Sequence, residues 1–347
     1  MQKFKWLPLL CLAAISPGSK AQTPSIDSIK FFTDENLIEM TLTTDIRKLQ
    51  NEKKLEVYQD ATVNCRFPDS SVIEENVRVC ARGHYRRDNC TIPPLMLNFH
   101  NPGSPRLNSL GKLKLVIGCG TGSANEQLIL KEYLCYKIYN LLDGKSFRVR
   151  LMKVNYRDSR SKMKPFSQYA FFIEDDNDLA TRNDCIKKDK AELNTESTNR
   201  AQMTKVAVFQ YLISNGDWSV PGNHNIKLLY DRKNEKAPPY AVPYDFDHSG
   251  LVNAGYALPP EIFTERFGTE KVTERVYWGF PRTMEELETC FEEFRNLREN
   301  INALINNFSL LQSKERKELI NFIDEFYKTI DNKSQVQYIF IDKARRN

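Results

Sequence analysis

Two polar segments determine how the fold of this chain is interpreted: Asn215-Gly-Asp-Trp-Ser-Val-Pro-Gly-Asn-His-Asn225 and Val242-Pro-Tyr-Asp-Phe-Asp-His248. The first segment follows an apolar run and contains Asn, Gly and Pro, so it predicts a tight, exposed loop after a helix. The second predicts a short apolar strand that ends in two carboxylates on one face of the extended chain. Polar loops of this kind, held on a rigid scaffold, are where catalytic groups concentrate.

The acids and amides of these segments are the residue types that Mg²⁺-dependent phosphoryl transfer needs. Asp217 is expected to orient the attacking hydroxyl. Asp245 and Asp247 would repel each other unless a cation or a proton lay between them, which predicts a metal site. The amide oxygen of Asn225 can complete an oxygen-only Mg²⁺ shell, with Asn223 as an alternative. Taken singly, each of these residues also fits ordinary turn chemistry or a solvated strand end.

Composition is typical of an ordinary folded protein. The chain has 347 residues, of which 41% are hydrophobic, enough to build a buried core. Its 50 basic and 45 acidic residues leave a formal net charge of +5. This small excess argues against a dedicated nucleic-acid-binding protein, in which basic residues cluster without interleaved acids.

The N-terminus predicts a secretory signal peptide over residues 1–21. Lys3 and Lys5 precede an apolar run at 6–15 that is too short to span a bilayer. Small residues at Ser19 and Ala21 predict cleavage before Gln22. The expected location is therefore periplasmic or extracellular, with no membrane association required. An uncleaved N-terminal anchor is the alternative.

Cysteine usage fits an exported chain. Seven cysteines remain after the predicted cleavage site, an odd number, so at least one stays outside any intramolecular disulfide. Cys80 and Cys90 flank a turn at Arg82-Gly83 and are candidates for a disulfide across it. Buried free cysteine is the alternative for both residues.

The pattern of apolar residues predicts an α+β protein, with a mostly β part that contains one helix and then a mostly α part. We expect four units: the signal peptide (1–21), an N-terminal extension with edge strands (22–60), a β-rich lobe (61–180) and a helical lobe (181–347). Strands are predicted at 37–44, 76–80, 94–99, 113–117, 148–156, 167–174 and 226–230. Helices are predicted at 123–142, with a capping box from Ser123 to Glu126, and at 201–213, 285–308 and 313–327.

Short motifs between residues 77 and 250 share their residue types and their order with a known family: Arg82-Gly83, 169–174, Asn215-Gly-Asp217, His224-Asn225 and Pro243-Tyr-Asp-Phe-Asp247. On these motifs the chain resembles the CotH-like (spore-coat protein H) kinases, an atypical branch of the protein-kinase-like fold. The resemblance implies a bilobal fold, ATP, Mg²⁺ or Mn²⁺, and transfer of the γ-phosphoryl group to a protein hydroxyl. It matches Asp217 to the catalytic-loop aspartate, Asn225 to the loop asparagine and Asp245 to the metal-binding aspartate.

Residues that bind the nucleotide are expected in the first half of the chain, which lacks the usual glycine-rich phosphate loop of kinases. Lys114, on a predicted strand, is the candidate phosphate-binding lysine, and Glu132 on the following helix is its expected partner. Lys112 and Arg82, the latter in a basic turn that continues to residue 87, are alternatives, since arginine forks suit phosphate oxygens. The resemblance also places Glu174, at the end of the last strand before the hinge, at the cofactor site.

Two functions from different classes follow. The first is an exported kinase with a protein substrate, or with a sugar or lipid acceptor as the alternative. The second is a catalytically degenerate kinase-fold protein with a structural or binding role at the cell envelope. The second is favoured by the scarcity of ATP outside the cytoplasm and by the long spacing between Asp217 and Asn225.

Overall fold

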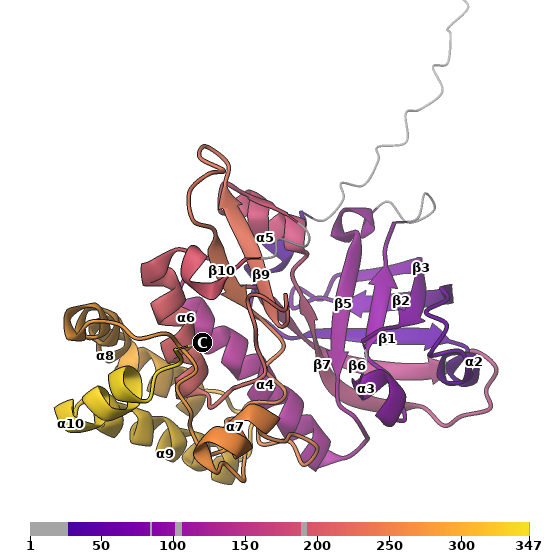
Figure 1. Cartoon of the computed structure of the whole chain (residues 1–347). Helices are drawn as coiled ribbons and strands as arrows, with labels where there is room; N and C mark the ends of the chain where they lie inside the picture. Colours follow the sequence, from indigo (N-terminus) through magenta and orange to yellow (C-terminus); the bar gives the residue numbers. More distant parts are fainter. Residues whose placement is uncertain (1–26, 84, 101–105, 189–192, 347) are drawn as a thin grey trace, which may run out of the picture.

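A computed structural model describes residues 27–83, 85–100, 106–188 and 193–346, so the predicted signal peptide lies outside the described residues. Seven strands of the first half form a closed barrel with the strand order β1-β2-β3-β4-β5-β7-β6 (Figure 1). The barrel strands are β1 (Ile38–Thr44), β2 (Gln59–Arg66), β3 (Val72–Ala81), β4 (Leu95–Asn98), β5 (Lys112–Ile117), β6 (Val149–Asp158) and β7 (Phe166–Ile173).

Alternating apolar residues fill the barrel. On β1, Ile38, Met40 and Leu42 are buried, whereas the residue between the first two is exposed. This period of two puts one set of side chains inside and the other outside. Six of the seven strand pairings are antiparallel, and the seventh, between β1 and β6, is parallel.

The expected bilobal kinase-like arrangement, with a β lobe followed by an α lobe, is wrong, although the α+β mixture of elements is as expected. The sheet closes because β1 pairs on both sides: Leu42 lies opposite Val63 of β2 and opposite Tyr156 of β6. A strand that was expected only at an edge therefore removes both edges of the sheet. The second half also contains a sheet of its own, in the order β10-β9-β8, made of β8 (Cys185–Lys187), β9 (Ile226–Asp231) and β10 (Tyr240–Pro243).

The helices and their bounds are α1 (Ser28–Phe31), α2 (Ile46–Asn51), α3 (Tyr85–Asn89), α4 (Ser123–Leu142), α5 (Asp176–Arg182), α6 (Arg200–Leu212), α7 (Glu261–Phe267), α8 (Met284–Asn306), α9 (Ser313–Ile330) and α10 (Lys333–Val336), followed by a π-helical turn (Gln337–Asp342). The predicted bounds of α4 are confirmed. Its predicted capping box is wrong, because the N-cap is Gly122 and no side chain caps the helix. Glu126 instead forms an ion pair with Lys153, at 2.7 Å.

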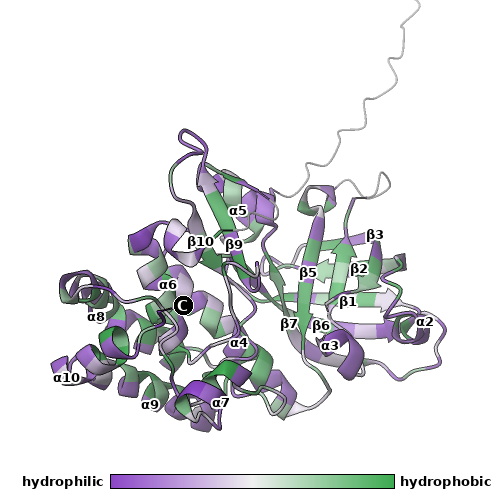
Figure 2. Cartoon of the chain, in the orientation of Figure 1, coloured by the Kyte–Doolittle hydropathy of each residue, from purple (hydrophilic) through white to green (hydrophobic). Residues whose placement is uncertain are grey.

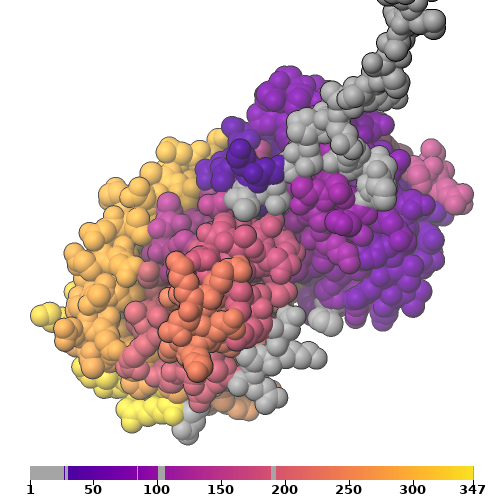
Figure 3. Space-filling view, turned by 90° about the horizontal axis from the view of Figure 1, so that it is seen from above, coloured from indigo at the N-terminus to yellow at the C-terminus, as the bar shows by residue number. Residues whose placement is uncertain are grey.

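Two hydrophobic cores hold the molecule together. One fills the barrel, and the other runs from the outer faces of β6 and β7 through α4 to the helices of the second half. Seen from above, the barrel and the C-terminal helices lie at opposite ends of the molecule (Figure 3). The outer helices α8 and α9 carry both hydrophobic and hydrophilic residues (Figure 2), as expected of helices with one buried face. Among the described residues, no helix is both long and apolar enough to span a membrane.

Candidate active site

The loop after α6 folds into a small hairpin. Ser219 and His224 exchange two backbone hydrogen bonds of 2.9 Å, and the Pro221-Gly222 tip is exposed. Asn225 follows in a left-handed backbone conformation, with a φ of 52°, and leads directly into β9. The hairpin thus takes up the extra residues after Asp217 and returns Asn225 to its side.

Asp217 is held by the two residues at the end of this hairpin. His224 Nε2 lies 2.6 Å from Asp217 Oδ1, and Asn225 Nδ2 donates to Asp217 Oδ2 at 3.0 Å. Burial raises the pKa of Asp217, but the hydrogen bonds and the charge of His224 outweigh it, so that the pKa of Asp217 is lowered. The hydrogen bond to Asp217 raises the pKa of His224. Asp217 is therefore an ionised carboxylate at neutral pH. Its side chain remains 35% exposed to solvent, so a substrate can reach it.

The backbones of the two polar segments contact each other. The N–H group of Tyr244 donates to the carbonyl oxygen of Asn225 at 3.0 Å. Asp245 follows with a positive φ of 63°, and its N–H group donates to the hydroxyl of Tyr136 on α4 at 2.8 Å. The nearby charge of Asp217 contributes to a raised pKa of Asp245, behind the larger effects of burial and of Asp247. The loop and the strand end therefore form one polar site.

Arg86 of α3 lies at the centre of an acid cluster, defined here as Glu132, Asp245 and Asp247. Its guanidinium nitrogens are 3.3 Å from Glu132 Oε2, 3.5 Å from Asp245 Oδ1 and 3.2 Å from Asp247 Oδ2. Tyr256 also donates its hydroxyl hydrogen to Asp247 at 3.0 Å. The side chain of Glu132 is 1% exposed and that of Asp247 is 9% exposed, so most of this charge is removed from water.

The acid cluster carries more negative charge than Arg86 can balance. Three carboxylates against one guanidinium leave an excess of two negative charges when all are ionised. Burial raises the pKa of Glu132 to about 8 in spite of Arg86. Burial and the adjacent Asp247 likewise raise the pKa of Asp245. Such a cluster is stabilised by protons or by a further cation.

A basic cluster lies beside the acid cluster. It consists of Lys114 on β5, Lys187 on β8 and Lys227 on β9, whose ammonium groups lie 3.6, 3.8 and 3.2 Å from the carboxylate of Asp176. Lys114 and Lys227 also face the ring of Tyr244, at 5.4 and 5.7 Å from its centroid. Tyr244 immediately precedes Asp245 of the acid cluster. The lysines of the barrel and of the second sheet therefore lie next to that cluster.

The structure brings together Asp217, Asn225, Asp245 and Asp247, and it also places Lys114 close by. It does not form the expected pair between Lys114 and Glu132, because Arg86 contacts Glu132 and Lys114 contacts Asp176. Arg82 lies near the site, since its charge lowers the pKa of Asp245.

Glu174 has a structural role at the end of the barrel. Both of its carboxylate oxygens bind Arg182, at 2.7 and 2.9 Å, and one of them also accepts the N–H hydrogen of Arg148 at 3.0 Å. Its side chain is fully buried. These bonds tie the Glu174 side chain to Arg182 and to the backbone of Arg148.

Four residues of the site and one disulfide were not identified from the sequence, and Lys187 of the basic cluster is among the four. Asp176, Lys227 and Tyr256 carry no motif, although the position of Lys227 two residues after Asn225 in a strand was a usable signal. The disulfide joins Cys90 to Cys119, and Cys80 is a buried free thiol, so the pairing suggested for Cys80 is wrong. Cys119 lies in the turn before α4, and the bond therefore ties α3, with Arg86, to the start of the helix that carries Glu132.

Comparison with known proteins gives little further information. No family model and no curated protein match the chain. Among solved structures, it is similar to the Helicobacter pylori proinflammatory kinase CtkA, with a TM-score of 0.38 and 11% sequence identity over 72% of this chain and 92% of that chain. A likeness this distant carries no argument about function, and membership of the CotH-like family is not shown.

Proposed function

We propose that this protein is an ATP-dependent phosphotransferase that uses Mg²⁺ or Mn²⁺ and transfers the γ-phosphoryl group to a hydroxyl of a protein substrate. One observation carries the proposal: an ionised, half-exposed Asp217 lies in the same polar site as a carboxylate cluster with excess negative charge, and a basic cluster flanks both. Phosphoryl transfer needs these three kinds of group in one place.

The residues present fit a divalent cation that arrives with phosphate. Asp245 and Asp247 offer carboxylate oxygens, and Asn225 uses its amide nitrogen to bind Asp217, which leaves its amide oxygen for another contact. Within the described residues, no group of three or more His, Cys, Asp or Glu side chains is arranged to hold a metal ion by itself. This agrees with Mg²⁺, which is usually bound by one or two carboxylates together with substrate phosphates. When bound, the ion would neutralise charge that develops on the phosphates.

Asp217 is the group that would align the acceptor hydroxyl and accept its proton. Its lowered pKa keeps it ionised, and the hydrogen bonds from His224 and Asn225 fix the orientation of its carboxylate. A general base must lie within hydrogen-bond reach of the proton that it accepts, so this fixed orientation is part of the function.

The basic cluster would contact the phosphates of the nucleotide. Lys114 and Lys227 both contact the single carboxylate of Asp176, so two ammonium groups on the wall of the site are balanced there by one carboxylate. Burial lowers the pKa of Lys114, and the charge of Asp176 partly offsets this effect. An incoming phosphate would provide the further negative charge that these lysines lack.

Export and the acceptor are parts of the proposal that rest on the sequence. A sugar or a lipid head group is the alternative acceptor. The competing function is a non-catalytic binding protein, and the position of Arg86 favours it, because its guanidinium contacts the carboxylate oxygens that a metal ion would use.

Transfer of labelled phosphate from ATP in the presence of Mg²⁺ or Mn²⁺ tests the proposal. We expect activity in the intact protein, its loss in Asp217→Asn and Asp245→Asn, and full activity in the matched control Asp60→Asn, whose side chain is exposed on the outside of the barrel. ATP with Mg²⁺ at a hundredfold excess over Kd should stabilise the protein by about 2.7 kcal/mol. Absence of any thermal shift with nucleotide would favour the binding protein, and full activity of Asp217→Asn would exclude the role assigned to Asp217.

A further inference from the structure

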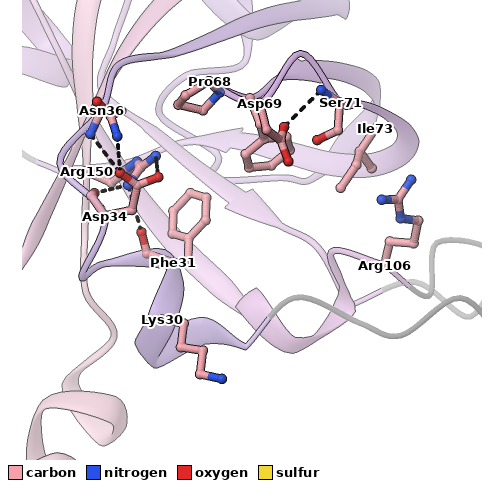
Figure 4. A pocket seen from close by; sticks show the side chains of 11 residues that line it. Lys30, Phe31, Asp34, Asn36, Pro68, Asp69, Ser71, Ile73, Arg106 and Arg150 are labelled. Carbon is pink, nitrogen blue, oxygen red and sulfur yellow. Dashed lines mark hydrogen bonds and ion pairs between the residues drawn. The ribbon is translucent and has the colours of Figure 1, made fainter.

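A cavity lies at one end of the barrel, and none of its lining residues belongs to the candidate active site. Its volume is about 510 Å³, within the range of roughly 300–1,000 Å³ that is typical of small-molecule sites. Its wall is formed by α1 with the following turn, by the connection between β2 and β3, by Arg106, and by Arg150 of β6 (Figure 4).

Part of the wall is apolar. Phe31 is 7% exposed and Ile73 is 3% exposed, and Phe67 and Pro68 lie beside them in the lining. Hydrocarbon that enters such a site is removed from water, which favours binding. The cavity can therefore hold an apolar chain or ring.

The polar part of the wall contains two arginines with unsatisfied nitrogens. Arg150 and Arg106 lie on opposite sides of Phe31 (Figure 4). Arg150 pairs with Asp34 at 2.8 Å, yet its buried Nε has no hydrogen-bond partner within the described part of the chain, and the same holds for Nε of Arg106. Both Nε atoms are themselves inaccessible, so a ligand in the cavity would contact the rest of the Arg106 side chain, which is only partly buried.

The charges of the lining residues also favour an anion. Asp34 is neutralised by Arg150, and its carboxylate also accepts hydrogen bonds from Asn36. Asp69 accepts the N–H hydrogen of Ser71 at 2.9 Å. Lys30 and Arg106, in contrast, form no ion pair with any described residue. The hydrogen bond from Ser71 does not neutralise Asp69, so the three cations of the lining (Lys30, Arg106 and Arg150) face two carboxylates (Asp34 and Asp69) and leave it a net charge of +1.

We propose that this cavity binds an amphiphilic organic anion, with its head group on Arg106 and Lys30 and its hydrocarbon part against Phe31 and Ile73. The head group is a carboxylate or a phosphate monoester, since both present the acceptor oxygens that an arginine fork can bind. This binding site is independent of the proposed phosphotransferase function, because the two sites share no residue.

Isothermal titration calorimetry with four probes of equal chain length tests the proposal on the full chain. We expect octanoate or octyl phosphate to bind with a Kd below about 1 mM, and octanol and octylamine to bind at least tenfold more weakly, a difference of about 1.4 kcal/mol. The comparison of octanoate with octyl phosphate identifies the preferred head group.

Three variants locate the site. Arg106→Met and Lys30→Glu should each weaken binding of the preferred anion at least tenfold, and Arg47→Met, at an exposed position of α2, should leave it unchanged. Lys30 is exposed, so Lys30→Glu remains informative if Arg106→Met fails to fold. Equal binding of octanol and octanoate, an unchanged affinity in Lys30→Glu, or the absence of heat with both anions would overturn the proposal.

Discussion

Replacement of Arg86 by Met removes the only cation that contacts all three members of the acid cluster within the described structure. Methionine has a similar length but no charge, and the nitrogens 3.3 Å from Glu132, 3.5 Å from Asp245 and 3.2 Å from Asp247 are lost. Removal of one partner from a buried charge pair costs about 3–5 kcal/mol, because the other charge remains buried and uncompensated. We expect a loss of stability of about this size at pH 8.

The loss should depend on pH in a defined direction. Burial already raises the pKa of Glu132 to about 8, and removal of the guanidinium raises it further. A carboxyl group whose pKa is raised on folding contributes stability that is fully present below its unfolded pKa, which is about 4.3, and is lost as the pH rises through its folded pKa. Because Glu132 keeps its proton in both folded proteins well below pH 8, its contribution to the difference between them should be small near pH 4.5 and should develop as the pH rises through about 8, where only the variant keeps the proton.

Urea unfolding followed by tryptophan fluorescence at pH 4.5, 6 and 8, with and without Mg²⁺, measures both effects. Arg87→Met is the matched control, because Arg87 lies on the same short helix but pairs with the exposed acids Glu56 and Asp88, and its loss should change stability little. Mg²⁺ should stabilise Arg86→Met more than the unmodified protein, because the guanidinium no longer competes for the same oxygens. Equal stability of Arg86→Met and the unmodified protein at pH 8, or equal stabilisation of these two proteins by Mg²⁺, would refute this reasoning.

Three further predictions concern the same region. Glu132→Gln should flatten the fall in stability between about pH 4.5 and 8, since its raised pKa causes much of that fall; urea unfolding across this range measures it, and an unchanged slope would contradict the assignment. The pKa of His224, followed by NMR titration, should lie above 6.5 and should drop in Asp217→Asn, because the hydrogen bond to Asp217 raises it; an unmoved pKa would exclude the pair. Replacing Cys90 and Cys119 by Ser opens a loop with a sequence separation of 29 and should lower the free energy of unfolding by about 3–4 kcal/mol under oxidising conditions; a double variant as stable as the disulfide-bonded protein would show that the bond adds no stability.

The helices were predictable because their signals are long and periodic. The predicted bounds of α4 coincide with those of the structure, and α6, α8 and α9 differ from prediction by a few residues at their ends. The barrel was not predictable, because β2 was overlooked and because closure depends on pairing between β1 and β6, which are far apart in the sequence. A strand's own residues indicate that it has a buried face but do not identify its second neighbour.

The parts of the site that are formed by residues close together in the sequence were predictable. The pairing of Asp217 with Asn225 follows from a loop that returns to its starting point, and Asp245 and Asp247 lie two residues apart just after β10, although in a turn with a positive φ at Asp245 rather than on the extended chain that was expected. The partner of Glu132 was not predictable, because a lysine on β5 and an arginine on α3 were equally plausible candidates. The disulfide to Cys119 holds α3 beside α4, and this long-range restraint favours Arg86.

The contacts of Arg86 are unequal, and this inequality bears on how an arginine and a metal ion can share one site. Two guanidinium nitrogens bind Glu132, at 3.3 and 3.4 Å, whereas Asp245 and Asp247 each receive a single contact, of which that to Asp245 is the longest at 3.5 Å. A two-pronged contact is stronger and more directional than a single one. A cation that binds Asp245 would therefore displace the longest contact first and leave Arg86 on Glu132 and Asp247. On this reasoning, Arg86 and Glu132 form a lasting buried pair, and Asp245, whose side chain is 37% exposed, is the part of the cluster that can exchange one cation for another.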